Sequence, residues 1–299
     1  MASVESTQKI TSAMKMVSAA KLRRAQNTIL KMRPYAKELS SILSHLLSTA
    51  SEGETNPLEI QRVPEKVIMV IITSNKGLCG GFNNNVLKRM ESLLSGEYAT
   101  QMAQHQVQFI GIGKKAIEYL NRKKYPVVKS YESILDHCTF AEAGEIAEGL
   151  MNQFSHKEID KVVMVYNKFK NAATQELMNE TYLPIHFEET PAASTKKNGS
   201  GDKTEKESHT ALNDFIFEPS RNELYQQLVP SMTKMKFYQC LLESIAAEHG
   251  ARMTAMHKAT ENASELTKQL NLTYNKLRQA AITNELIEMV SGAESLKNA

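Results

Sequence analysis

The feature that most constrains the fold is the C-terminal stretch, which has the pattern of one very long helix. No proline follows Pro230, and Gly250 is the only glycine before Gly292, where we expect the helix to end. At ~1.5 Å per residue the helix would reach roughly 90 Å, far beyond the helices of compact domains. One ordinary core cannot bury such a helix along its length, so other surfaces must surround part of it.

The composition is that of a soluble globular protein, with 41% hydrophobic and 23% charged residues in 299. A formal net charge of +3 is too small to argue for nucleic acid as a partner. The charge is uneven, however, because residues 1–40 carry only Glu5 and Glu38 against eight cations: Lys9, Lys15, Lys21, Arg23, Arg24, Lys31, Arg33 and Lys37. Two interpretations stay open, an acidic partner or a solvated face.

Cysteine usage and hydropathy bear on the compartment. Cys79, Cys138 and Cys240 have no paired spacing, which is typical of a reducing compartment and indicates no metal site. No run approaches the ~18 apolar residues of a membrane span, and the N-terminus has the pattern of neither a signal peptide nor a transit peptide. We expect an intracellular protein that reaches a membrane only through partners.

Residues 1–55 are predicted to form an N-terminal coiled-coil helix. Residues 3–50 lack glycine and contain one proline, Pro34, which should kink or divide the helix. Ile10, Met14 and Val17 recur at helical spacing. A longer apolar stripe follows Pro34 and consists of Leu39, Ile42, Leu43, Leu46 and Leu47.

Residues 65–189 change period and predict an α/β domain. The unbroken β-branched run 67–72 is typical of a strand buried on both faces of a parallel sheet. Further strands are predicted at 107–111 and 162–169, and helices at 86–94, 114–121 and 141–154. This alternation predicts three layers around a mainly parallel sheet.

The remaining chain divides into a polar loop at 190–210, predicted to be disordered, and a segment 211–299 that contains the long helix. Along that helix a coiled-coil seam is formed by Ala263, Leu266, Leu270, Tyr274, Leu277 and Ala281. The predicted fold is therefore an antiparallel coiled coil of the two terminal helices plus a central three-layer α/β domain.

The turn at 73–83 is the strongest candidate for a ligand site, because it joins a strand to a helix and is rich in glycine. It matches neither G-x-G-x-x-G nor G-x-x-x-x-G-K-[ST], and the run from Gly111 to Lys114 also lacks the phosphate-loop spacing. A turn shaped by close packing is the favoured interpretation.

Two adjacent pairs, His137 with Cys138 and Glu248 with His249, could suggest metal or acid–base chemistry. Neither belongs to a recognisable ligand set. We predict no catalytic residues, no metal site and no cofactor.

Four segments together, 6–26, 74–83, 251–263 and 282–293, resemble the gamma subunit of F-type ATP synthases. The last resembles the family signature, with Thr283, Glu285, Glu288, Gly292 and Ala293 in the expected places. The resemblance implies a non-catalytic rotating central shaft. It couples proton flow through the membrane ring to conformational cycling of the nucleotide-binding subunits, in ATP synthesis and in reverse hydrolysis.

The same resemblance implies the partners. The coiled coil would fill the hole of a hexamer of alternating alpha and beta subunits, and the α/β domain would be the foot on the membrane c-ring beside the small epsilon subunit. No nucleic acid is implied, and membrane contact comes only through partners. The implied location is the cytoplasmic face of a bacterial plasma membrane, or alternatively the matrix face of the mitochondrial inner membrane.

Residue roles also follow from the resemblance. Met14 and Lys15 resemble the contact with the acidic lever loops of the catalytic subunits. Arg278, Gln279 and Thr283 resemble a polar catch that engages the hexamer, and Met289 and Val290 resemble the apolar tip in its bearing. The foot segment that meets the ring and epsilon would include Phe215, Phe217 and Glu218.

Two other classes of protein stay open on the residues alone. One is an α/β nucleotide-binding protein with a coiled-coil oligomerisation stalk, supported only by the turn at 73–83. The other is a coiled-coil tether or cytoskeletal adaptor, which would associate with itself through both helices.

Overall fold

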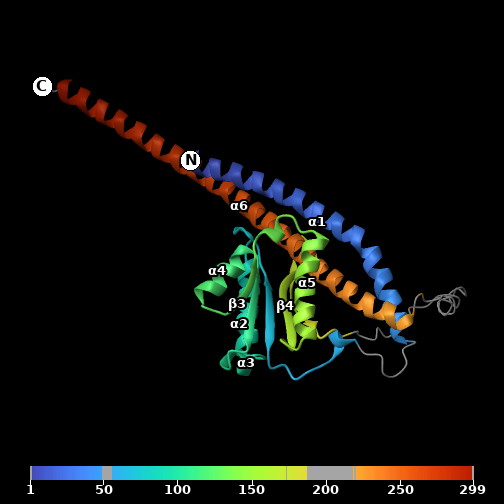
Figure 1. Ribbon diagram of the computed structural model, residues 1–299. Coiled ribbons are helices and arrows are strands. Elements are labelled where there is room, and N and C mark those ends of the chain that lie inside the picture. Colours follow the sequence, from blue (N-terminus) through green and yellow to red (C-terminus); the bar gives the residue numbers. More distant parts are fainter. Residues whose placement is uncertain (1, 49–55, 173, 187–217, 219, 298–299) are drawn as a thin grey trace, which may run out of the picture.

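The computed structural model describes residues 2–48, 56–172, 174–186, 218 and 220–297. It consists of two long helices and a compact α/β unit attached to one side of them, as Figure 1 shows. The predicted loop at 190–210 lies outside the described residues, as do Phe215 and Phe217.

The two long helices, α1 (Ala2–Ser48) and α6 (Arg221–Lys297), form the predicted antiparallel coiled coil. Near one end Arg221 donates a hydrogen bond to the carbonyl of Leu46, and farther along the Thr260 hydroxyl donates to Thr11 Oγ1 at 2.8 Å. These pairs run in opposite directions along the chain. α1 therefore begins beside the middle of α6, and the rest of α6 projects past the N-terminus (Figure 1).

Three expected helix limits were wrong. α6 starts at Arg221 and runs through Pro230, and it continues past Gly292 to Lys297. α1 is not divided at Pro34, although Figure 1 shows it curving along α6. A proline inside a helix costs ~3 kcal/mol. At Pro230 the burial of the neighbouring Tyr225 and Val229 against the domain core opposes this cost.

The sheet has the order β3-β2-β1-β4-β5. Its strands are β1 (Val67–Ile72), β2 (Val107–Ile112), β3 (Val127–Tyr131), β4 (Lys161–Phe169) and β5 (Gln175–Leu183). β3, β2, β1 and β4 are parallel, and β5 pairs antiparallel with β4. The three central strands were predicted, whereas the edge strands β3 and β5 were not.

Helices cover both faces of the sheet and make the predicted three layers. One face carries α2 (Phe82–Ser95), α3 (Ala99–Ala103) and α4 (Lys114–Arg122), and the other packs on α5 (Phe140–Ser155) and the early part of α6. Two short 3-10 turns, η1 (Pro57–Glu59) and η2 (Ser133–Leu135), complete the unit. Side chains of β1 alternate between the two cores, which explains why the whole strand is apolar.

The face of α1 that packs on α6 differs from the one predicted near its start. Ile10 and Val17 are exposed, and Thr11 and Ser18 are buried instead. Both buried hydroxyls donate to carbonyls of the preceding turn, so their burial leaves no polar group unpaired. Farther along, Leu22, Ala25 and Ile29 pack with Leu242 and Ala246, and Leu39, Leu43 and Leu46 are buried as expected.

A search of the described helices finds none with the length and apolar character needed to cross a bilayer.

Candidate partner-binding shaft

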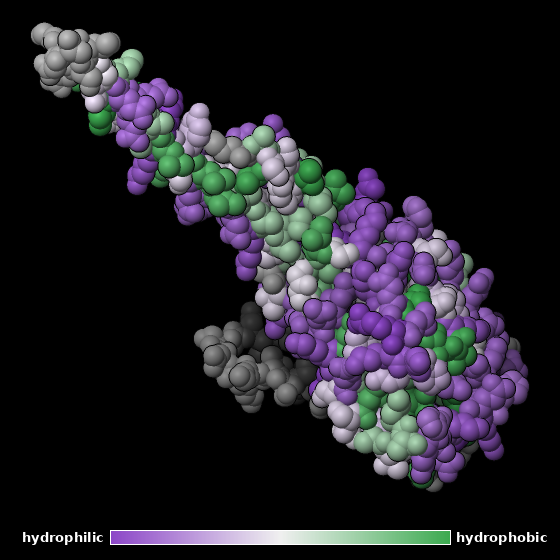
Figure 2. All heavy atoms as spheres, turned by 90° about the vertical axis from the view of Figure 1, so that its left-hand side faces the viewer, coloured by the Kyte–Doolittle hydropathy of each residue, from purple (hydrophilic) through white to green (hydrophobic). Residues whose placement is uncertain are grey.

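The projecting part of α6 is the largest surface that this chain leaves uncovered. Every residue from 271 to 293 is exposed, over roughly 35 Å of helix. Many of these side chains are large and apolar: Leu272, Tyr274, Leu277, Ile282, Leu286, Ile287, Met289 and Val290. Figure 2 shows hydrophobic patches along this arm, between hydrophilic ones.

The predicted coiled-coil seam is covered only at its beginning. Ala263 is buried, but Leu266 is 45% exposed and Leu277 is 66% exposed. No described helix of this chain lies against the seam beyond its first residues, because α1 begins beside the middle of α6. The seam past Ala263 is therefore not a contact between the two helices of this chain, as the sequence predicted, but an open surface.

Five predicted partner-binding residues lie on this projecting part. Arg278, Gln279 and Thr283 are exposed within about a turn and a half of helix, and the Thr283 hydroxyl donates to the Gln279 carbonyl at 2.8 Å. Met289 and Val290 are each 63% exposed nearer the end. The two groups therefore occupy successive levels of one lone helix.

The other predicted contact, Met14 with Lys15, lies on α1 and is half-buried. Lys15 Nζ is 3.4 Å from His257 Nδ1 of α6, so this pair sits roughly 30 Å along α6 from Arg278. The structure thus separates the two predicted contacts along the shaft. Of the predicted foot residues only Glu218 is described, and it is exposed.

The cations of α1 face outward. Seven of the eight are exposed, and Lys15 is the half-buried exception. Within the described residues, none of the eight forms an ion pair with a carboxylate. This side of the shaft therefore presents uncompensated positive charge.

The glycine-rich turn after β1 packs against α6. Cys79 and Phe82 form a small buried cluster with Ala247 and Ala251. The turn is held internally by Asn83, whose side-chain oxygen accepts from the Ser74 amide at 2.9 Å. These contacts support the interpretation that close packing shapes the turn.

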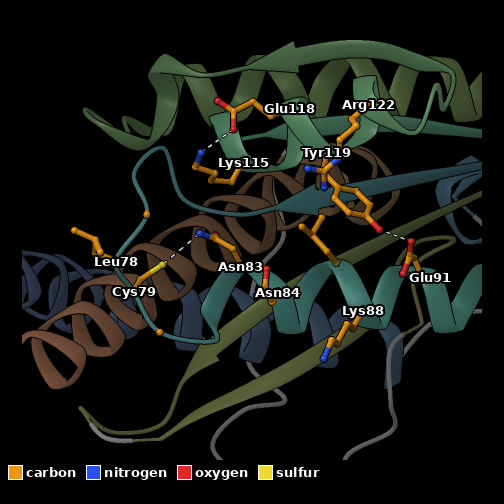
Figure 3. A pocket seen from close by; sticks show the side chains of 13 residues that line it. Leu78, Cys79, Asn83, Asn84, Lys88, Glu91, Lys115, Glu118, Tyr119 and Arg122 are labelled. Atoms are coloured by element: carbon orange, nitrogen blue, oxygen red, sulfur yellow. Dashed lines mark hydrogen bonds and ion pairs between the residues drawn. The ribbon is translucent and has the colours of Figure 1, made fainter. Parts of the chain in front are cut away.

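A cleft of about 510 Å³ opens beside the turn, between α2 and α4 (Figure 3). Its rim carries mixed charge, since Lys115 pairs with Glu118 at 2.7 Å and Tyr119 hydrogen-bonds to Glu91. Lys123 also lies 3.4 Å from Glu91. The carboxylates of this chain thus already neutralise two of the nearby cations.

Sequence reasoning missed a buried ion pair where α6 passes this turn. Glu248 and Arg252 are each 8% exposed, and Arg252 Nη1 donates to Glu248 Oε1 at 2.6 Å. Burial raises the pKa of Glu248, and Arg252 opposes that shift. Burial, with the charges of Arg252 and Lys21, lowers the pKa of the adjacent His249 to about 4. The i, i+4 spacing was visible in the sequence, but nothing marked the pair as buried.

Metal ligation finds no support at the two singled-out pairs. Across the described residues, no three His, Cys, Asp or Glu side chains gather as a metal site would require. Burial raises the pKa of the Cys138 thiol to about 12, which disfavours the thiolate.

The geometry defines a class of protein: a stalk, made of two antiparallel helices with a small α/β foot on one side and a lone amphipathic helix end on the other. Solved structures share this fold. One is the central stalk and c-ring of the Tetrahymena thermophila mitochondrial ATP synthase, with a TM-score of 0.57 and 23% identity over 84% of this chain and 99% of that one. Another is from the Euglena gracilis mitochondrial ATP synthase OSCP/F1/c-ring, with a TM-score of 0.61 and 18% identity over 99% and 92%.

Sequence relatives are closer. A sequence model of the ATP synthase family matches residues 1–296. The ATP synthase gamma chain of Cytophaga hutchinsonii is 44% identical over 297 residues, 99% of this chain and 96% of its own. That of Flavobacterium johnsoniae is 47% identical over 295 residues, 98% and 95% of the two chains. The chain belongs to the family of ATP synthase gamma chains.

Proposed function

We propose that this central-stalk subunit of ATP synthase is the rotating shaft of the complex. It couples proton flow through the membrane ring to conformational cycling of the catalytic subunits, in ATP synthesis and in reverse hydrolysis. The shaft carries out no chemistry itself, and the nucleotides bind to other subunits.

The observation that carries this proposal is the uncovered stretch 271–293 of α6. An isolated helix is marginal in water even with favourable residues, and exposed apolar surface of this extent on a soluble protein marks an interaction site. A partner must therefore cover the helix on all sides. A ring of subunits with a central hole is the arrangement that can do so while leaving the shaft free to turn.

Coupling follows from the shape of the shaft. A shaft can change the state of a surrounding subunit only by contacting two of its conformations differently. Here α1 and α6 lie side by side over one length and α6 continues alone beyond it, so the cross-section is not circular. Each orientation of the shaft thus favours a different conformation in each surrounding subunit.

The proposed ring is a hexamer of alternating alpha and beta subunits. Arg278, Gln279 and Thr283 would form the polar catch that engages it, and Met289 with Val290 the apolar tip in its bearing. Met14 and Lys15, within the uncompensated positive face of α1, would meet acidic lever loops of the catalytic subunits, where opposite charge favours approach and register.

At the other end the foot would stand on the membrane c-ring and the epsilon subunit, through Glu218 together with Phe215 and Phe217. The membrane is reached only through these partners, and no nucleic acid is involved. Since the relatives named above are bacterial, we place the complex on the cytoplasmic face of a bacterial plasma membrane.

The test is the composition of the complex purified under native conditions with this chain as bait. Native mass spectrometry should find one copy of this chain with a hexamer of two alternating larger subunits. Recovery as a homo-oligomer would support the tether or adaptor instead. Saturable binding of ATP by the isolated chain in equilibrium dialysis would support the nucleotide-binding alternative at the turn 73–83.

A further inference from the structure

The foot grips α6 where two of its loops meet the helix. On one side Cys79 and Phe82 of the β1–α2 turn pack on Ala247 and Ala251. On the other, the Thr254 hydroxyl donates to the carbonyl of Ala172, at the β4–β5 hairpin, at 3.0 Å. Beyond this level α6 bonds to α1 instead, through Thr260. Residues 247–254 are therefore the level at which the shaft leaves the foot.

Arg252 fills the contact on the turn side with hydrogen bonds. Its Nη2 donates to the Lys76 carbonyl at 2.8 Å, and its Nε lies 3.4 Å from the Gly77 carbonyl. Its Nη1 is bound to Glu248, which fixes the guanidinium plane relative to α6. One buried side chain thus joins a carboxylate of the shaft to two carbonyls of the foot.

The turn that receives Arg252 is itself braced against the rest of the foot. The Ser74 hydroxyl donates to the Lys76 carbonyl at 2.7 Å, and Asn75 Nδ2 donates to the Glu132 carbonyl at 2.8 Å. Thr73 Oγ1 accepts from the amide of Ala116 in α4 at 2.8 Å. A force on the Lys76 carbonyl is therefore passed to β2, α4 and the β3–η2 junction.

We propose that Arg252, oriented by Glu248, is a positioning residue that locks the rotation of the shaft to that of the foot. This inference rests on the shaft function proposed above. Apolar contacts between α6 and the foot hold the two together but are non-directional, whereas a forked set of charge-assisted hydrogen bonds fixes one relative orientation. Without the fork, the shaft yields at this level under load and part of the rotation of the foot is lost.

The experiment compares variants in the complete complex, reconstituted into vesicles, by the number of protons pumped per ATP hydrolysed. Arg252→Met removes the fork and should lower this ratio about threefold, within the range of measured coupling effects, while ATP hydrolysis continues. Arg252→Lys keeps the charge but not the planar fork, so it should restore the ratio only in part. The matched control is Arg89→Met, because Arg89 bonds only within the foot, to Asn179, and its loss should leave the ratio unchanged.

A wild-type ratio in assembled Arg252→Met complexes would overturn the proposal. If that variant fails to assemble, Glu248→Gln decides by the same ratio, since its amide oxygen still accepts from Arg252 but the ion pair is lost; a wild-type ratio there also overturns the proposal. A wild-type complex that shows no coupling at all would instead refute the shaft function. The two failures are therefore distinguishable.

Discussion

Gly113 is the residue at which the backbone leaves least freedom of sequence. Its φ of +93° lies in the region that favours glycine, and a Cβ there would lie 2.5 Å from the Thr73 carbonyl oxygen. Gly113→Ala should therefore lower the free energy of unfolding by about 2–3 kcal/mol, measured by chemical denaturation of the full chain. Gly77→Ala is the matched control, because no atom lies within 4 Å of its Cβ, and it should change stability little. Equal effects of the two changes would refute this account of the turn.

His249 gives the folded chain a pH dependence with a defined sign. Its pKa is about 4 in the folded state against 6.5 for the ordinary side chain. Between these values the unfolded chain binds a proton that the folded chain excludes, so stability falls as the pH is lowered from about 6.5 towards about 4. In His249→Gln part of this fall should disappear, which thermal unfolding across that pH range would measure. An unchanged slope would mean that other groups carry the acid sensitivity.

At this scale the sequence predicted residues with a family pattern better than residues with a purely tertiary role. Thr283 and Met289 were identified by resemblance and lie on the uncovered helix. Arg252 was not identified, because Glu and Arg at i, i+4 usually form an exposed helix pair. Its burial depends on the turn at Lys76, far away in the sequence. Thr11 and Ser18 were likewise missed because polarity normally indicates exposure.

Among the elements, the central strands were predictable because their continuous β-branched runs have one common explanation, burial on both faces. β3 and β5 were missed because an edge strand is only half covered, and the alternation in β5 is broken by the polar residues Glu176, Asn179 and Glu180. The limits of α6 were missed because packing on the foot tolerates Pro230, and because Gly292 lies on a lone helix with no atom near its Cβ. Local breaker rules gave way to tertiary context in both places.

The projecting part of α6 should behave differently in the free chain and in the complex. In hydrogen–deuterium exchange, residues 271–293 should exchange quickly in the free chain, since no tertiary contact protects that stretch. In the assembled complex the same amides should become protected, while those of β1 stay protected in both states. Fast exchange of 271–293 in the complex would mean that no ring encloses the helix.

The polar catch can be tested on the same element. Replacing Arg278, Gln279 and Thr283 together by alanine should leave the helicity and thermal stability of the free chain unchanged or slightly raised, because alanine has the highest helix propensity. In the reconstituted complex the change should greatly reduce ATPase activity. Each lost intersubunit hydrogen bond costs roughly 0.5–1.5 kcal/mol, and more where charge is involved. Full activity there would remove these residues from the proposed contact.

On the scale of the whole molecule, the arrangement separates two tasks. The foot supplies a packed, ordinary core, and nearly all of the conserved geometry of that core serves to hold α6 in place. The long helix carries the surfaces that this chain leaves open, polar at one level and apolar at the next. This division was foreseeable from the length of the helix alone, whereas the way the foot grips the helix required the structure.

The most direct test of the central claim is to watch the foot turn. A cysteine introduced at the exposed position Lys157 can carry a bead, with the complex fixed to a surface through the ring subunits. On addition of ATP the bead should rotate continuously in one direction, in steps whose number per turn equals the number of catalytic subunits. A bead that only fluctuates about one angle while the same complexes hydrolyse ATP would contradict the account.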